Sequence, residues 1–134
     1  MCILVDKTSR EDVMATPHVR AAELDTTDLE DLGPLALPLA APLGDPMPTH
    51  GRSLYETDNG SVLTGTWQCG PGESRWDFTD NAEFIHVLSG SMTCVEDDGT
   101  VTKVRPGDTV VFPKGWAGTW TIHETLRKVY VIFS

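Results

Sequence analysis

The side chains with the clearest potential for binding or catalysis lie in the second half of the chain. They are Trp67, Trp76, Trp116, Trp120, Lys128 and Tyr130. Indole rings can form a pocket that stacks on a planar or cationic ligand. Tryptophan also fills the cores of β-proteins, and we assign Trp67 and Trp120 mainly to that role. Trp76 is expected to serve both roles, and Trp116, which follows a tight turn, is expected at the mouth of a pocket.

Lys128 and Tyr130 share one face of the last expected strand, because side chains two residues apart point to the same side. If that face is inward, the two residues add an ammonium group and a phenol to a pocket. If it is outward, they are surface residues. The sequence leaves both possibilities open, and we count both among the candidate substrate-binding residues.

The elements that must position these residues are short strands. Alternating or apolar runs rich in Val, Thr and aromatic residues are separated by turns such as Asp97-Asp98-Gly99. The expected strands cover residues 61–69, 84–88, 91–96, 100–104, 109–112, 118–122 and 128–133. Many short strands with Gly and Pro turns between them are typical of an antiparallel sandwich or barrel, so the fold class is all-β.

The first part of the chain has a different pattern. Residues 9–14 predict a short helical turn with Ser9 as the N-cap. Five prolines between residues 31 and 48 predict an extended arm, because proline removes backbone donors and fixes φ. The leucines of this arm are too numerous for a free linker, so the arm should pack on the domain or on a second subunit. We therefore divide the chain into an arm at 1–52 and a barrel at 53–134.

Size and charge narrow the class of protein. A chain of 134 residues predicts one domain with a real core, and a net charge of -10 argues against nucleic acid and anionic membranes as partners. Cys2, Cys69 and Cys94 form no CxxC pair, so we expect three reduced thiols. The apolar run at 1–5 is too short for a signal peptide or a membrane span, which predicts a cytoplasmic protein.

Two blocks of the chain share the spacing of a known pair of motifs. These motifs, G-x5-H-x-H-x3,4-E-x6-G and G-x5-P-x-G-x2-H-x3-N, mark the cupin superfamily. The matching residues are Gly70, Glu83, Gly90, Gly107, Pro113 and Gly115. The chain resembles the cupins from about residue 53 to its C-terminus, which implies a single cupin β-barrel, also called a double-stranded β-helix or jelly roll.

The residues around the two motifs resemble one branch of the cupin superfamily in particular. The residues that carry this resemblance are 65–72, 112–116, 118–120 and 127–132. They look like small "predicted enzyme" cupins related to (S)-ureidoglycine aminohydrolase and to the cupin of ethanolamine utilisation. Many members of this branch have no assigned activity.

The metal ligands of the cupin pattern are replaced in this chain. Trp76, Phe78 and Gly118 stand at the histidine positions. One remaining carboxylate is not a metal site, so we expect no metal and no cofactor. Strand alternation puts Trp76 and Phe78 on one face, which should be the barrel interior, and there they would offer aromatic surface to a ligand. His50 of the arm could still supply an unorthodox ligand.

Glu83 is the sharpest catalytic candidate. A carboxylate inside an aromatic barrel is desolvated, so its pKa should rise and it could act as a general acid or base near neutrality. The alternative is a structural acid paired with Arg75, Arg127 or Lys128.

Three functions follow from these residues and the resemblance. The leading hypothesis is a metal-independent cupin enzyme, an isomerase, lyase, cyclase or hydrolase, that acts on a small polar or aromatic metabolite through Glu83. The second is a non-catalytic metabolite-binding cupin, either a sensor or an accessory subunit. The third is a metal-dependent cupin with unorthodox ligands. Cupin domains of this size commonly pair through a sheet, so we also expect a homodimer.

Overall fold

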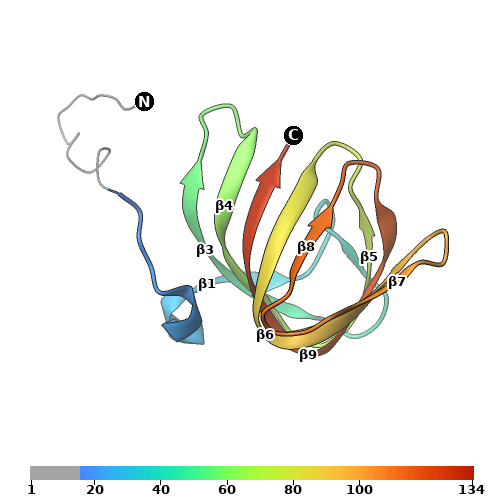
Figure 1. Cartoon of the computed structure of the whole chain (residues 1–134). Coiled ribbons are helices and arrows are strands. Elements are labelled where there is room, and N and C mark those ends of the chain that lie inside the picture. Colours follow the sequence, from blue (N-terminus) through green and yellow to red (C-terminus); the bar gives the residue numbers. More distant parts are fainter. Residues whose placement is uncertain (1–15) are drawn as a thin grey trace.

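The computed structural model describes residues 16–134, and almost all of its regular structure is β (Figure 1). The strands are β1 (Glu30–Pro34), β2 (Ala41–Pro42), β3 (Pro48–Glu56), β4 (Val62–Cys69), β5 (Gly72–Asp77), β6 (Ala82–Glu96), β7 (Val101–Val104), β8 (Thr109–Phe112) and β9 (Ala117–Phe133). Two three-residue 3-10 turns precede them, η1 (Ala21–Glu23) and η2 (Thr26–Asp28). The predicted all-β barrel is confirmed. The helical turn predicted at 9–14 lies outside the described residues.

Two long strands, β6 and β9, form the spine of the barrel. They pair antiparallel over almost their whole length, from Ala82 opposite Phe133 to Glu96 opposite Gly118. The other edge of β9 pairs first with β5 and then with β4. The free edge of β6 pairs with β8 and with β7. All strands thus join in one curled sheet whose concave side encloses the core (Figure 1).

The spine bends where β6 crosses from one half of the sheet to the other. Its register with β9 shifts between Val87 and Met92, and Gly90 lies within this irregular segment. Gly90 has a φ of +81°, which favours glycine. A Cβ at this position would also collide with the carbonyl oxygen of Thr125 on β9. The bend therefore requires glycine both for its backbone angle and for the close approach of two strands.

The core lies on the concave side and follows the alternation of the strands. On β6, Ile85 and Val87 are fully buried, whereas Phe84 and His86, which alternate with them, point outward. Aromatic rings fill the centre: Trp76 of β5 stacks on Trp120 of β9 with ring centroids 3.8 Å apart. The core is therefore built from a large aromatic cluster that reaches from β5 to β9.

The proline-rich stretch is extended, as predicted, and runs along the barrel. β1 pairs with β3, β2 pairs with β5, and the backbone N–H of Leu43 donates to the carbonyl of Glu73. Of the five leucines in the arm, Leu35 is buried and the other four are exposed. Strand β3 crosses residue 52, the predicted end of the arm. Among the described residues no helix is long and apolar enough to cross a membrane.

Replacing Gly90 with alanine tests the bend. Gly99, in the turn after β6, is a matched control, because it has a φ of +94° and open space around its Cα. Both Gly90→Ala and Gly99→Ala should lose about 1–3 kcal/mol of unfolding free energy from the unfavourable φ. Gly90→Ala should lose at least about 2 kcal/mol more, because strands β6 and β9 must separate. Urea unfolding measures both, and equal losses would contradict the steric argument.

Candidate functional site

The centre of the barrel holds a buried ion pair. The Lys128 Nζ atom of β9 lies 2.5 Å from the Glu83 Oε2 atom of β6, and each side chain is only 3 % exposed. Both strands present these residues to the concave side, and the long lysine side chain spans the offset between them along the sheet. Charges removed from water cost several kcal/mol each unless they are paired, so each residue makes the burial of the other tolerable.

Aromatic rings surround the ammonium group of Lys128. Its Nζ atom lies 4.6 Å from the ring centroid of Trp67, 5.0 Å from that of Trp120 and 5.7 Å from that of Trp76. The Tyr130 ring is 6.0 Å away. The faces of aromatic rings attract a cation, more strongly when water is excluded. One carboxylate and four rings therefore replace the water that Lys128 would otherwise bind.

Two cavities border Glu83 of this ion pair. The larger has a volume of about 540 Å³ and the smaller about 210 Å³. Trp76, Glu83, Leu39 and Ile132 line both of them. Lys128, Tyr130 and Trp67 line the smaller cavity, and Phe78 lines the larger. A ligand in either cavity would lie against both the aromatic surface and the Glu83 carboxylate.

The site residues predicted from the sequence fall into two groups, those that line a cavity and those that do not. Glu83, Trp67, Trp76, Phe78, Lys128 and Tyr130 line the cavities. The inward orientation of Lys128 and Tyr130, which the sequence left open, follows from the pairing of β9 with β4 and β6. Trp120 and Trp116 line neither cavity. Trp120 stacks on Trp76. Trp116 packs edge-on against Phe112, with ring centroids 5.1 Å apart.

Other lining residues were not singled out by the sequence. Ile132 follows Tyr130 by two residues, so the same period-two argument would have placed it on the inward face. Leu39 comes from the arm, and no local pattern links it to a cavity formed by distant strands. Asp77 and Asp80, at the end of β5 and in the turn that follows it, line the larger cavity.

The residues at the cupin ligand positions do not fit a metal ion. Trp76 and Phe78 offer ring surface, and a Cβ at Gly118 would collide with the backbone of β6. The remaining carboxylate, Glu83, is bound to a lysine ammonium group. His50 pairs with Gln68 on the outer face of the sheet, away from Glu83. Residues 16–134 contain no cluster of three or more histidine, cysteine or acidic side chains that could hold a metal.

Burial changes the titration of three groups near the ion pair. It raises the pKa of the Tyr130 phenol, and the negative charge of Glu83 raises it further. Burial also raises the pKa of the Cys69 thiol to about 11 and that of the Cys94 thiol to about 12, although Lys128 opposes both shifts. All three groups are therefore protonated near neutrality, and the two thiols are poor nucleophiles.

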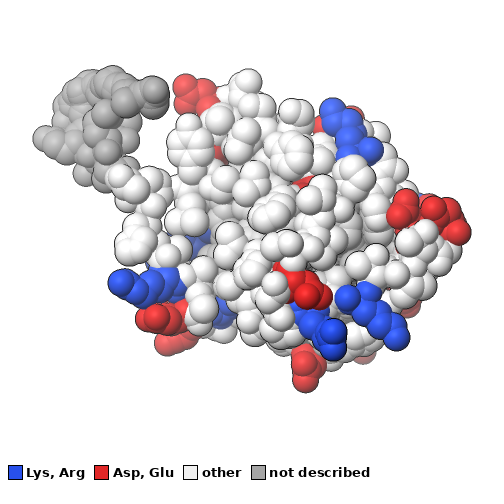
Figure 2. Space-filling view, in the orientation of Figure 1, with Lys and Arg blue, Asp and Glu red and all other residues white. Residues whose placement is uncertain are grey.

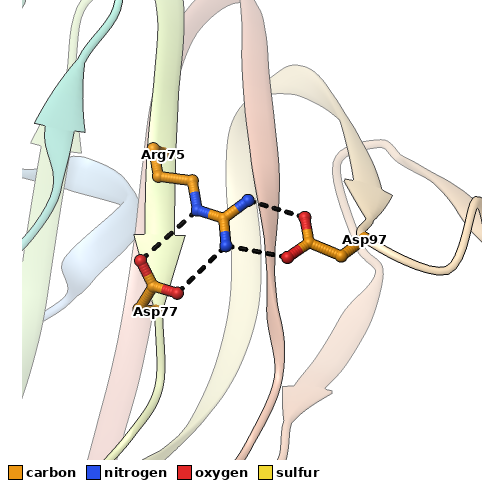
Figure 3. A network of polar contacts seen from close by, with 3 residues as sticks. All are labelled: Arg75, Asp77 and Asp97. Carbon is orange, nitrogen blue, oxygen red and sulfur yellow. Dashed lines mark hydrogen bonds and ion pairs between the residues drawn. The ribbon is translucent and has the colours of Figure 1, made fainter.

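The other basic residues considered as partners for Glu83 are engaged elsewhere. Arg75 donates to both carboxylate oxygens of Asp97, at 2.6 and 2.8 Å, and to both of Asp77, at 3.1 and 3.3 Å (Figure 3). These bonds join β5 to the turn after β6, and the Arg75 hydrogen bonds lower the pKa of Asp97. Arg127 donates to the Gln68 side chain and to the carbonyl of Leu24.

Comparison with known proteins identifies the family. A family model described as the EutQ-like cupin domain matches residues 56–130, more than half of the chain. The chain belongs to the cupins. A comparison with curated proteins finds no match.

Solved structures share this cupin barrel. A DUF861 family protein of unknown function from Pseudomonas syringae pv. tomato is 21 % identical with a TM-score of 0.68, over 78 % of this chain and 43 % of that one. This cupin thus spans less than half the length of the Pseudomonas protein. The ethanolamine utilisation protein Q of Salmonella typhimurium is 22 % identical with a TM-score of 0.55, over 64 % and 69 % of the two chains. The polyketide cyclase RemF of Streptomyces resistomycificus is 24 % identical with a TM-score of 0.58, over 82 % and 77 %.

The ion pair gives a stability prediction. Lys128→Met and Glu83→Met should each lower the unfolding free energy by about 3–5 kcal/mol, because each leaves one buried charge without its partner. The double variant removes both charges and should recover most of that loss. Denaturant unfolding of the four proteins measures the coupling. Losses that simply add in the double variant would contradict a direct interaction between the two residues.

Proposed function

We propose that this cupin is a metal-independent enzyme for a small polar or aromatic metabolite, with Glu83 as its general acid or base. The observation that carries the proposal is the buried Glu83–Lys128 pair, in which Glu83 borders two cavities. Elsewhere in the barrel interior the described side chains are mainly apolar or aromatic. In the smaller cavity the lining groups that can take or give a proton are Glu83, Lys128 and Tyr130.

Each residue has a role that fits its position. A planar or apolar part of the substrate would rest against Trp76 and Phe78, which line the larger cavity. Glu83 would take or give a proton at the reacting carbon or oxygen. The Tyr130 phenol is protonated near neutrality and would donate a hydrogen bond to a developing oxyanion. These roles suit an isomerase, lyase, cyclase or hydrolase.

The structural neighbours are consistent with an enzyme. The polyketide cyclase RemF has the same barrel, so ring-closing enzymes are among the proteins that use it. A shared barrel at this level of identity says nothing about the substrate. The proposal for this chain therefore rests on its own buried pair.

A second candidate is a binding protein without catalysis, such as a sensor or an accessory subunit. One observation favours it: the Glu83 carboxylate already has a lysine partner at 2.5 Å and so has a structural role without any substrate. Turnover of a bound compound distinguishes the two candidates.

The partners that we propose are small molecules, and we place the protein in the cytoplasm. The net charge of -10 opposes binding to nucleic acid and to anionic membranes. Figure 2 shows one face of the described residues, on which basic side chains lie mostly toward the rim and form no continuous patch. A phosphate backbone would therefore find no basic track on this face.

We also propose a homodimer. Phe84 lies between Val111 of β8 and Val131 of β9 on the outer face of the sheet, and both Phe84 and Val111 are exposed. Neighbouring exposed apolar side chains of this kind suit an isologous contact between two sheets. Sedimentation at micromolar concentration should give the mass of two chains, and Phe84→Lys should convert it to one. A wild-type monomer would contradict the proposal.

The catalytic role of Glu83 is tested with a panel of small metabolites. Thermal-shift screening identifies compounds that bind, and turnover is then measured for the wild type and for Glu83→Gln. Loss of the general acid or base should lower turnover by about 100-fold or more while binding persists. Glu73→Gln, on the exposed part of β5, is the matched control and should keep full turnover. Undiminished turnover by Glu83→Gln would refute the assigned role.

A further inference from the structure

We propose that Lys128 is a nucleophile that forms an imine with an aldehyde or ketone held in the smaller cavity. This inference rests on the proposed function, because Glu83 moves the protons in both. It adds a covalent step and names the substrate class: a carbonyl compound with an apolar or aromatic body.

The Lys128 ammonium group is incompletely hydrogen-bonded by the described residues. An ammonium group has three donors. Among the described residues, Nζ makes one hydrogen bond, to Glu83, and its other near neighbours are the faces of aromatic rings. Ring faces attract a cation but accept hydrogen bonds only weakly. Attack on a carbonyl carbon requires the neutral amine, and the Glu83 carboxylate, 2.5 Å away, is placed to take the proton that must first leave Nζ.

The smaller cavity has the size and the lining for a small carbonyl compound. Its volume is about 210 Å³, and its wall includes Lys128 and Glu83 together with Trp67, Trp76 and Ile132. A small aromatic or apolar carbonyl compound would therefore lie beside Nζ and the carboxylate at once. Lysines that form Schiff bases are typically desolvated, and imine formation also needs a nearby group that can take up and return protons. Lys128 meets both conditions.

The step balances within this site. Glu83 takes one proton from the Nζ atom, and the freed electron pair forms a C–N bond with the carbonyl carbon. The C=O π electrons move to the oxygen, which receives the proton from Glu83 to give a carbinolamine. Glu83 then removes the second proton from nitrogen, a C=N bond forms, and the hydroxyl group leaves as water with that proton. The sum is ammonium plus carbonyl to protonated imine plus water, and Glu83 ends as the carboxylate that it was at the start.

The remaining groups around Nζ do not compete for the carbonyl compound. Cys69 and Cys94 are protonated near neutrality, because burial raises both pKa values. The Tyr130 phenol is likewise protonated and is suited to donate a hydrogen bond to the carbonyl oxygen. Lys103 and Lys114 are exposed, so they have neither a dry cavity nor a buried carboxylate. Reaction at Lys128 should therefore be selective.

Reductive trapping tests this selectivity directly. The full-length protein is incubated with benzaldehyde and sodium cyanoborohydride, which reduces an imine to a stable benzylamine, and peptide mass spectrometry locates the benzyl groups. Lys128 should be labelled at least about tenfold faster than Lys103 and Lys114. Labelling of the surface lysines alone, or at an equal rate, would overturn the proposal. This comparison uses only the wild-type protein, so it does not depend on the folding of a variant.

Variants separate this inference from the proposed function. Lys128→Arg keeps a cation beside Glu83 but cannot form an imine, so its benzyl label at residue 128 should vanish. Glu83→Gln should slow labelling of Lys128 by at least about tenfold, because the proton acceptor is gone. If Glu83→Gln loses turnover while Lys128 is never labelled, the imine is wrong and the proposed function stands. If Lys128 is labelled while Glu83→Gln keeps full turnover, the proposed function fails and the nucleophile stands.

Discussion

The interior of the barrel is organised around the ion pair between Glu83 and Lys128. This pair joins the two longest strands, β6 and β9, inside the barrel, and both side chains are almost fully buried. Two separated charges could not remain at this depth, because removing an ion from water costs several kcal/mol. The surrounding rings of Trp67, Trp76 and Trp120 exclude water and attract the ammonium group. Exclusion of water also strengthens the electrostatic interactions of a group that transfers protons inside the barrel.

The pair also explains how the chain keeps a cupin barrel without the usual metal ligands. In the family pattern histidines and a glutamate converge inside the barrel. Here indole and phenyl rings stand at two of the histidine positions, Trp76 and Phe78, and Lys128 supplies the positive charge beside Glu83. Lysine differs from a metal ion because it can lose a proton and attack carbon. Under our proposal, the replacement exchanges Lewis-acid chemistry for acid–base and nucleophilic chemistry.

The sequence predicted the barrel well, because glycine and proline spacings report local turns. Gly90 is an example: its positive φ and its contact with β9 require glycine wherever this bend occurs. The sequence also placed Lys128 and Tyr130 on one face, but it could not say which face, since that depends on pairing with β4 and β6. It named Lys128 as one of three possible partners of Glu83 because nothing local distinguishes them. The position of Leu39 beside both cavities depends on the path of the arm, so the sequence could not predict it.

The central claim is that Glu83 binds Lys128 in place of a metal ion. Purified, untagged protein can be equilibrated with Zn²⁺, Mn²⁺ and Fe²⁺, passed through a desalting column and measured for metal content by elemental analysis. The account predicts far less than one metal ion per chain. The residues at the histidine positions of the cupin motifs have no side-chain atom that can coordinate a metal, and the Glu83 carboxylate is already bound to Lys128. One transition-metal ion per chain, lost in Glu83→Gln, would contradict it.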